Sequence, residues 1–122
     1  MSNPFVHVEL QTTDPEKAKE FYSRLLDWQL QDIPLDDEGG VYTLIRVGEG
    51  VGGGMMKHPC PDAPSHWLAY IAVDDAAATA KRAKELGATV ICERTEVPNF
   101  GWFSVISDPT GAVVAFWECK KE

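Results

Sequence analysis

The chain has 122 residues, of which 44% are hydrophobic and 25% are charged, and this size fits one compact domain with its own core. The formal net charge of −8 argues against binding to nucleic acid or to an anionic membrane, because both require clustered Lys and Arg. No uncharged stretch is long enough to span a bilayer, and the three cysteines form no CxxC pair. We therefore expect a cytoplasmic protein with a single domain over residues 1–122 and a small-molecule partner.

The first half of the chain predicts the element order β-α-β-β-β. In the opening strand, apolar side chains alternate with the polar side chains of His7, Glu9 and Gln11, which predicts one apolar and one polar face. Asp14 followed by Pro15 predicts the start of an amphipathic helix of about three turns. The other strands of this half are expected over residues 28–35, 41–47 and 55–56.

The second half repeats this order about sixty residues later. Asp14 corresponds to Asp75 and His7 to Leu68, an offset of 61 residues in both cases. The expected elements are a strand over 67–73, a helix over 76–86 and strands over 89–97, 101–107 and 112–119. A proline-rich linker over 58–65 would join a first βαβββ module over 5–57 to a second over 66–122. The expected fold class is therefore α+β.

Three phrases of the sequence carry a family resemblance when they are taken in order. They are HVELQTTDPEKAKEFYSRLLDW from residue 7, WLAYIAVDD from residue 67 and DPTGAVVAFWE from residue 108. Together with the duplicated module, they resemble the vicinal-oxygen-chelate superfamily (glyoxalase/bleomycin resistance protein/dioxygenase) and its branch of predicted enzymes related to lactoylglutathione lyase. The resemblance covers nearly the whole chain. It implies a curved, funnel-like mixed sheet with the helices outside and a ligand cavity on the concave face.

The implied fold gives each face of the strands a role. The apolar side of the first strand would pack under a helix face bearing Phe21 and Leu25. The polar side, with His7 and Glu9, would face the cavity, and an apolar, aromatic pocket with one polar patch would result. The expected ligand-binding residues are Gln11, Tyr70, Trp102, Val113 and Trp117, with Trp102 either at the pocket rim or at a subunit contact.

The resemblance also implies a test for a divalent metal. Metal-dependent members of the superfamily bind the ion through one ligand on the first strand and one on the last strand of each module. His7 occupies the first of these positions, but Leu68 and Ala115 stand at two others. Residues 52–56, which would supply the remaining ligand, offer only methionine thioethers. Since tight binding usually needs at least three protein ligands, we predict no cofactor and no metal site, with His7 the only surviving ligand position.

Three functions remain open at this point. The chain could be a protein that binds a small, partly apolar organic ligand without a complete metal site. It could be a metal-independent lyase or isomerase in which His7 and Glu9, about 6.5–7 Å apart on one strand face, act as acid and base. It could also be a metal-dependent glyoxalase-like lyase or a dioxygenase, as the resemblance suggests. The resemblance further implies a homodimer.

Overall fold

The computed structural model describes residues 2–34, 40–58 and 63–120. Its helices and strands follow the order β-α-β-β-β twice, which confirms the α+β class and the repeated module. The chain divides into two compact units, His7–Leu68 and Met1–Val6 with Ala69–Glu122, which are described in turn. The linker over 58–65 stays a prediction, and its residues 59–62 lie outside the described residues.

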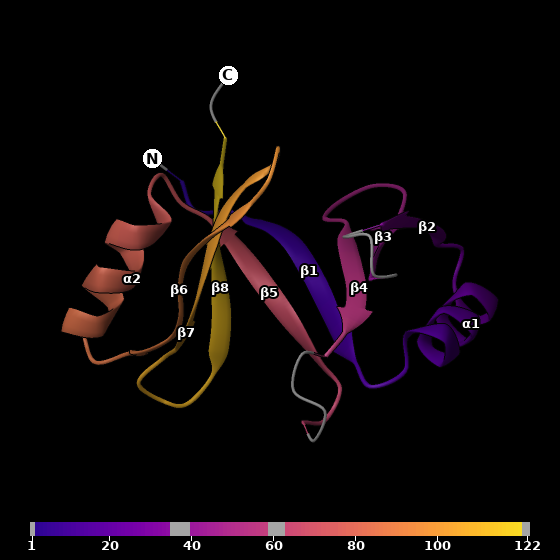
Figure 1. Cartoon of the computed structure of the whole chain (residues 1–122), viewed down its shortest axis with the longest axis horizontal. Coiled ribbons are helices and arrows are strands. Elements are labelled where there is room, and N and C mark those ends of the chain that lie inside the picture. The colour runs from indigo at the N-terminus through magenta and orange to yellow at the C-terminus, as the bar shows by residue number, and fades with distance from the viewer. Residues whose placement is uncertain (1, 35–39, 59–62, 121–122) are drawn as a thin grey trace. The chain divides into compact units, whose positions relative to one another are not determined.

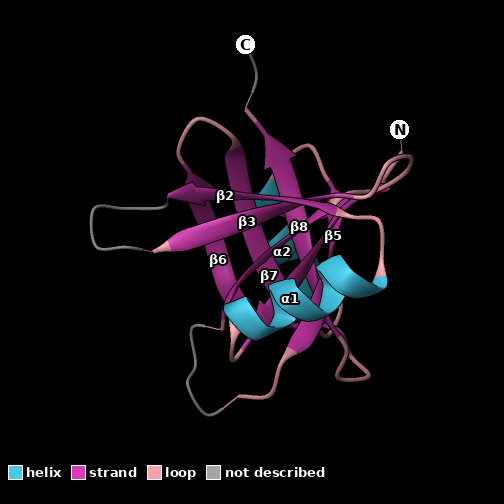
Figure 2. Cartoon of the chain, turned by 90° about the vertical axis from the view of Figure 1, so that its right-hand side faces the viewer, coloured by secondary structure: helices cyan, strands magenta, loops and turns pink. Residues whose placement is uncertain are grey.

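The unit His7–Leu68 is built on a mixed sheet with the strand order β2-β3-β4-β1. The strands are β1 (Phe5–Thr12), β2 (Gln29–Pro34), β3 (Val41–Arg46) and β4 (Gly53–Lys57). β1 runs parallel to β4, whereas β2, β3 and β4 are antiparallel neighbours, and β2 and β3 lie side by side in Figure 2. Because β4 lies between β1 and β3, a side chain of β3 can reach β1 only across β4.

Both helices begin at the aspartates that the sequence predicted as caps. The helices are α1 (Pro15–Leu25) and α2 (Ala76–Glu85). The Oδ1 atom of Asp14 accepts a hydrogen bond from the backbone N–H of Lys17 over 3.1 Å, and Asp75 accepts one from Ala78 over 3.0 Å. These bonds satisfy N–H groups that the first turn of a helix leaves without an internal acceptor. In the described part of the chain, neither helix is long and apolar enough to cross a membrane.

Helix α1 packs against one face of its sheet, but the side chains that make this contact are not the ones expected. The buried core of this unit consists of Leu10, Ile45 and Met55. Ala18 and Tyr22 of α1 pack against that core, whereas Phe21 and Leu25 are 56% and 60% exposed, so the expectation that these two would face the sheet was wrong. The apolar stripe of α1 includes both Tyr22 and Phe21, so the sequence alone allows either side chain to face the sheet. Because Leu10 faces α1, strand alternation turns the polar side chains of β1 to the opposite face.

The other unit repeats this arrangement. Its strands are β5 (His66–Ala72), β6 (Thr89–Val97), β7 (Gly101–Ser107) and β8 (Val113–Cys119). They follow the order β5-β8-β7-β6, with β5 parallel to β8 and antiparallel pairing elsewhere. Helix α2 contacts β6, β7 and β8 and lies beside them in Figure 1. Strand by strand, this sheet has the same order and directions as the sheet of the first unit.

The strand register fixes the correspondence between the two units at the level of residues. Glu9 pairs with Gly54 across β1 and β4, and Tyr70 pairs with Ala115 across β5 and β8. Glu9 to Tyr70 and Gly54 to Ala115 are both steps of 61 residues, the same offset that aligns the two halves of the sequence. Gly54 is therefore the counterpart of Ala115 in the first unit.

Candidate active site

A hydrogen-bonded network of four side chains lies on the sheet face opposite to α1. The Nε2 atom of His7 is 2.7 Å from the Oη atom of Tyr42, and the Tyr42 hydroxyl donates to Oε1 of Glu9 over 3.0 Å. The Nε2 atom of Gln11 donates to the other carboxylate oxygen of Glu9, Oε2, over 2.8 Å. The three polar side chains of β1 are thus joined into one network by a tyrosine from β3.

Glu9 is the buried centre of this network, with only 5% of the residue exposed. A buried carboxylate is tolerated only when its oxygens accept hydrogen bonds, because an unpaired buried charge costs several kcal/mol. Each oxygen of Glu9 has such a donor, one from Tyr42 and one from Gln11. The network therefore holds the carboxylate of Glu9 at a fixed place.

His7 is half-buried, and its ring lies nearly parallel to that of Tyr42, at a centroid distance of 6.3 Å and an interplanar angle of 22°. Burial lowers the pKa of the His7 imidazole below its ordinary value of 6.5, and the nearby Glu9 carboxylate raises it by a smaller amount. The lowered pKa favours the neutral imidazole of His7 at pH 7, which is the form that can accept a proton.

Tyr42 reaches across β4 because that strand has a glycine at the crossing point. Leu44 pairs with Gly54, so Tyr42, two residues earlier on β3, sends its ring diagonally over Gly54. A Cβ atom built on Gly54 would lie 1.9 Å from Oη and 2.2 Å from Cζ of Tyr42. Any other residue at position 54 would displace the ring. Tyr42 was not predicted from the sequence, because the alternation of β3 separates its side chain from that of Thr43 but does not show which strands lie beside β3.

The remaining expected ligand-binding residues lie in the other unit. Tyr70 is buried and shares a sheet face with the half-buried Trp117 and the exposed Val113. Trp102 lies on the opposite face, because it pairs with Glu118, whose carboxylate contacts the start of α2. The structure therefore brings Tyr70, Val113 and Trp117 together on one face and places Trp102 on the other.

Glu118 and Trp102 belong to a charged cluster at the start of α2. The Oε1 atom of Glu118 accepts a hydrogen bond from the N–H of Ala76 over 2.9 Å, and Arg94 donates to both carboxylate oxygens over 3.1 and 3.2 Å. The Arg94 guanidinium also lies 4.1 Å from the centroid of the Trp102 ring. An acidic group at this place stabilises the helix N-terminus. Glu118 therefore serves the fold, and it lies on the opposite sheet face from Ala115.

The residues at the superfamily's metal-ligand positions do not fit a divalent ion. Only His7 offers a donor atom, because the other positions hold Leu68, Ala115 and, by the strand register, Gly54. The ring of Tyr42 fills the space in which a ligand side chain on residue 54 would begin. Among the described residues, no group of three or more His, Cys, Asp and Glu side chains is placed to hold a metal. One donor atom is fewer than the three protein ligands that tight binding usually needs, and the absence of a metal site stays a prediction.

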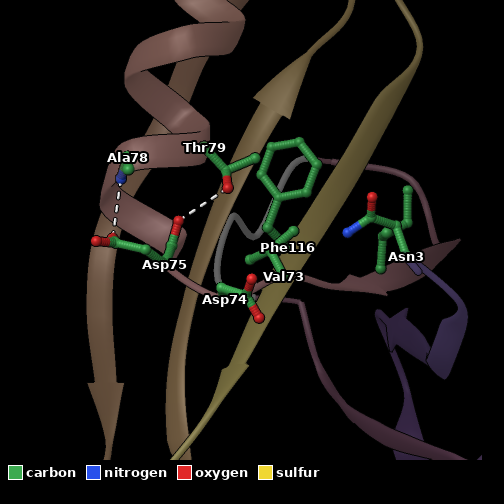
Figure 3. A pocket seen from close by; sticks show the side chains of 8 residues that line it. Asn3, Val73, Asp74, Asp75, Ala78, Thr79 and Phe116 are labelled. Atoms are coloured by element: carbon green, nitrogen blue, oxygen red, sulfur yellow. Dashed lines mark hydrogen bonds between the residues drawn. The ribbon is translucent and has the colours of Figure 1, made fainter. Parts of the chain in front are cut away.

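Two hollows among the described residues are lined by no member of this network, and neither was predicted from the sequence. One, of about 500 Å³, opens beside the start of α2 and is lined by Asn3, Asp74 and Phe116 among others. Figure 3 shows the Asp75 carboxylate at this hollow turned to the N–H of Ala78, so this group is engaged in the helix cap. The other, of about 290 Å³, has apolar walls that include Val8, Ile45, Trp28 and Trp67.

Comparison with known proteins agrees with this architecture. The family model described as "Glyoxalase/Bleomycin resistance protein/Dioxygenase superfamily" matches residues 5–116. Two curated relatives, each named "Putative glyoxylase CFP32", come from Mycobacterium bovis (strain ATCC BAA-935 / AF2122/97) and Mycobacterium tuberculosis (strain CDC 1551 / Oshkosh). Each is 39% identical over 105 residues, which are 86% of this chain and 40% of the relative. The chain thus matches well under half the length of these relatives.

Two solved structures share the fold at low sequence identity. The hypothetical protein BH1468 from Bacillus halodurans C-125 has a TM-score of 0.73 and 18% identity, with 100% of this chain and 98% of that chain covered. Methylmalonyl-CoA epimerase from Mycobacterium tuberculosis has a TM-score of 0.70 and 19% identity, with 96% and 88% covered.

Proposed function

Because the chain belongs to the glyoxalase/bleomycin resistance protein/dioxygenase superfamily, we propose that it binds a small, partly apolar organic ligand and converts it by metal-independent proton transfer. His7 and Glu9 act as the acid and base of a lyase or isomerase. The observation that carries the proposal is the network in which one hydroxyl, that of Tyr42, contacts both His7 and Glu9.

The electrostatics of the network support proton transfer. A proton acceptor must be neutral before the reaction, and burial keeps His7 in that form by lowering its pKa. Once His7 has accepted a proton, the buried carboxylate of Glu9 stabilises the imidazolium that results. The two groups therefore have complementary roles, one at the half-buried end of the network and one at its buried centre.

The names of the relatives support an enzyme over a protein that only binds its ligand. One relative is named a putative glyoxylase, and one protein of similar fold is named methylmalonyl-CoA epimerase. The donor set at the ligand positions of the superfamily, with His7 alone, supports chemistry that does not pass through a metal ion.

Solvent-deuterium exchange tests this proposal. The protein is incubated in D₂O with a panel of small carbonyl compounds that includes methylmalonyl-CoA, and deuterium in each compound is measured by mass spectrometry. We expect incorporation into at least one compound. His7→Ala and Glu9→Gln should each reduce the rate by about a hundredfold or more, the usual range for a lost acid–base group, while the compound still binds.

The control is Tyr22→Phe, which removes a tyrosine hydroxyl on the α1 side of the sheet and should leave the exchange rate unchanged. Binding of a panel compound without any exchange would indicate a binding protein instead of an enzyme. Exchange that survives His7→Ala would contradict the assigned role of His7.

A further inference from the structure

We propose that Tyr42, seated on Gly54, is the positioning residue of this site, and that its hydroxyl holds His7 in the Nε2–H tautomer and connects it to Glu9. This role rests on the proposed function, because the orientation of the imidazole matters for catalysis only if His7 exchanges a proton with a ligand. Tyr42 lies on β3 and Gly54 on β4, whereas His7 and Glu9 both lie on β1.

The direction of the hydrogen bonds follows from the number of protons. An ionised carboxylate only accepts hydrogen bonds, so the single hydroxyl proton of Tyr42 points to Oε1 of Glu9 over the 3.0 Å contact. The 2.7 Å contact between Oη and Nε2 of His7 then needs its proton from the imidazole. His7 is therefore protonated at Nε2, and in this tautomer of the neutral imidazole the basic nitrogen is Nδ1.

Gly54 leaves the space in which the ring of Tyr42 lies. Any other residue at position 54 would have a Cβ atom, and that atom would lie only 1.9 Å from Oη of Tyr42. By the strand register, residue 54 is also the counterpart of Ala115, one of the superfamily's ligand positions. A phenol thus stands where a ligand side chain would begin, and its hydroxyl holds the imidazole through the 2.7 Å contact with Nε2.

The network also supplies a path for the proton. When Nδ1 of His7 takes a proton from the ligand, the Nε2 proton passes to Oη of Tyr42, and the proton of that hydroxyl passes to Oε1 of Glu9. The ligand has then lost one proton and Glu9 has gained one, while His7 and Tyr42 are neutral again. No group is oxidised or reduced, and the reverse sequence returns the proton to the product.

The free protein provides the test. In ¹⁵N-labelled protein at about pH 8, where imidazoles are neutral, long-range ¹H–¹⁵N spectra report which ring nitrogen carries the proton. The three histidines of the chain can be assigned by substitution, with His58 and His66 as internal references. We expect His7 to be protonated at Nε2 and its Nε2–H proton to exchange with water slowly enough to be observed.

Two variants should remove that signal by different routes. Tyr42→Phe deletes the acceptor and keeps the ring, and Gly54→Ala displaces the ring while the backbone stays in place. Tyr22→Phe is the matched hydroxyl control, and Gly52→Ala is the glycine control, because its new Cβ would meet only the Ile45 carbonyl oxygen, at 3.1 Å. Both controls should keep the slowly exchanging proton.

Protonation of His7 at Nδ1, or an Nε2–H signal that survives Tyr42→Phe, would overturn the positioning role. Neither result bears on the proposed function, because neither measurement uses a ligand. A wild-type protein with the expected His7 signal but without deuterium exchange on any compound it binds would overturn the proposed function and leave the hydrogen-bond assignment intact.

Discussion

Replacement of Tyr42 by Phe removes one oxygen atom and two hydrogen bonds from the network. The bond to ionised Glu9 contributes about 1.5–3 kcal/mol, as bonds to charged groups do, and the bond from neutral His7 contributes about 0.5–1.5 kcal/mol. Water can replace part of the second bond because His7 is only half-buried, and Gln11 keeps its bond to Glu9. We therefore expect Tyr42→Phe to lower the free energy of unfolding by about 2–3 kcal/mol.

Urea unfolding followed by tryptophan fluorescence measures this loss. With a typical slope of about 1–3 kcal/mol per M, the midpoint should fall by about 0.7–3 M. Tyr22→Phe is the matched control, because the Tyr22 hydroxyl makes no hydrogen bond to the described residues, and its loss should cost about 0.5 kcal/mol or less. An equal loss of stability in the two variants would show that the hydrogen bonds of Tyr42 do not stabilise the folded protein.

The remaining expectations concern stability and the pKa of His7. Gly53→Ala would place a Cβ atom 2.1 Å from the backbone oxygen of Val8 and disrupt the pairing of β1 with β4. We expect the free energy of unfolding to fall by about 2–4 kcal/mol, and an unchanged urea midpoint would refute this expectation. The pKa of His7 is lowered by folding, so the unfolded chain binds that proton more strongly, and stability should fall as the pH drops through 6.5 and level off below the folded pKa. His7→Asn should flatten that decline, and Glu9→Gln should lower the His7 pKa further in an NMR titration, because the carboxylate raises it. Glu118→Gln should cost about 0.5–2 kcal/mol through the weakened start of α2, and calorimetry showing no change would argue against a charge effect there.

Local signals were sufficient for most of the fold. Asp14 and Asp75 were recognisable as caps because a cap depends on residues three positions away, and the structure shows both bonds. The alternation of β1 likewise predicted that His7 and Glu9 share a face, since strand period depends only on neighbouring residues. The offset of 61 residues between the halves was also readable, because Asp14 and Asp75 mark the same point in each half, the residue before the first helical residue.

Contacts between distant segments were not readable in the same way. The apolar stripe of α1 includes both Tyr22 and Phe21. The orientation of the helix on the sheet packs Tyr22 against the core and leaves Phe21 exposed. Tyr42 joins His7 only because β4 lies between their strands and has Gly54 at the crossing point. That contact combines a strand order, a register and a missing side chain, and no one stretch of the sequence contains all three.

The response of deuterium exchange to metal ions distinguishes proton transfer by His7 and Glu9 from catalysis through a bound metal. The protein is treated with EDTA, dialysed into metal-free D₂O buffer and assayed with the compound that exchanges fastest, and then again after addition of Zn²⁺, Co²⁺, Ni²⁺ or Mn²⁺. We expect the treated protein to keep its full exchange rate and none of the ions to raise it. Exchange that is lost with EDTA and restored by one of these ions would contradict metal-independent proton transfer, because the site would then work through a metal and not through His7 and Glu9 alone.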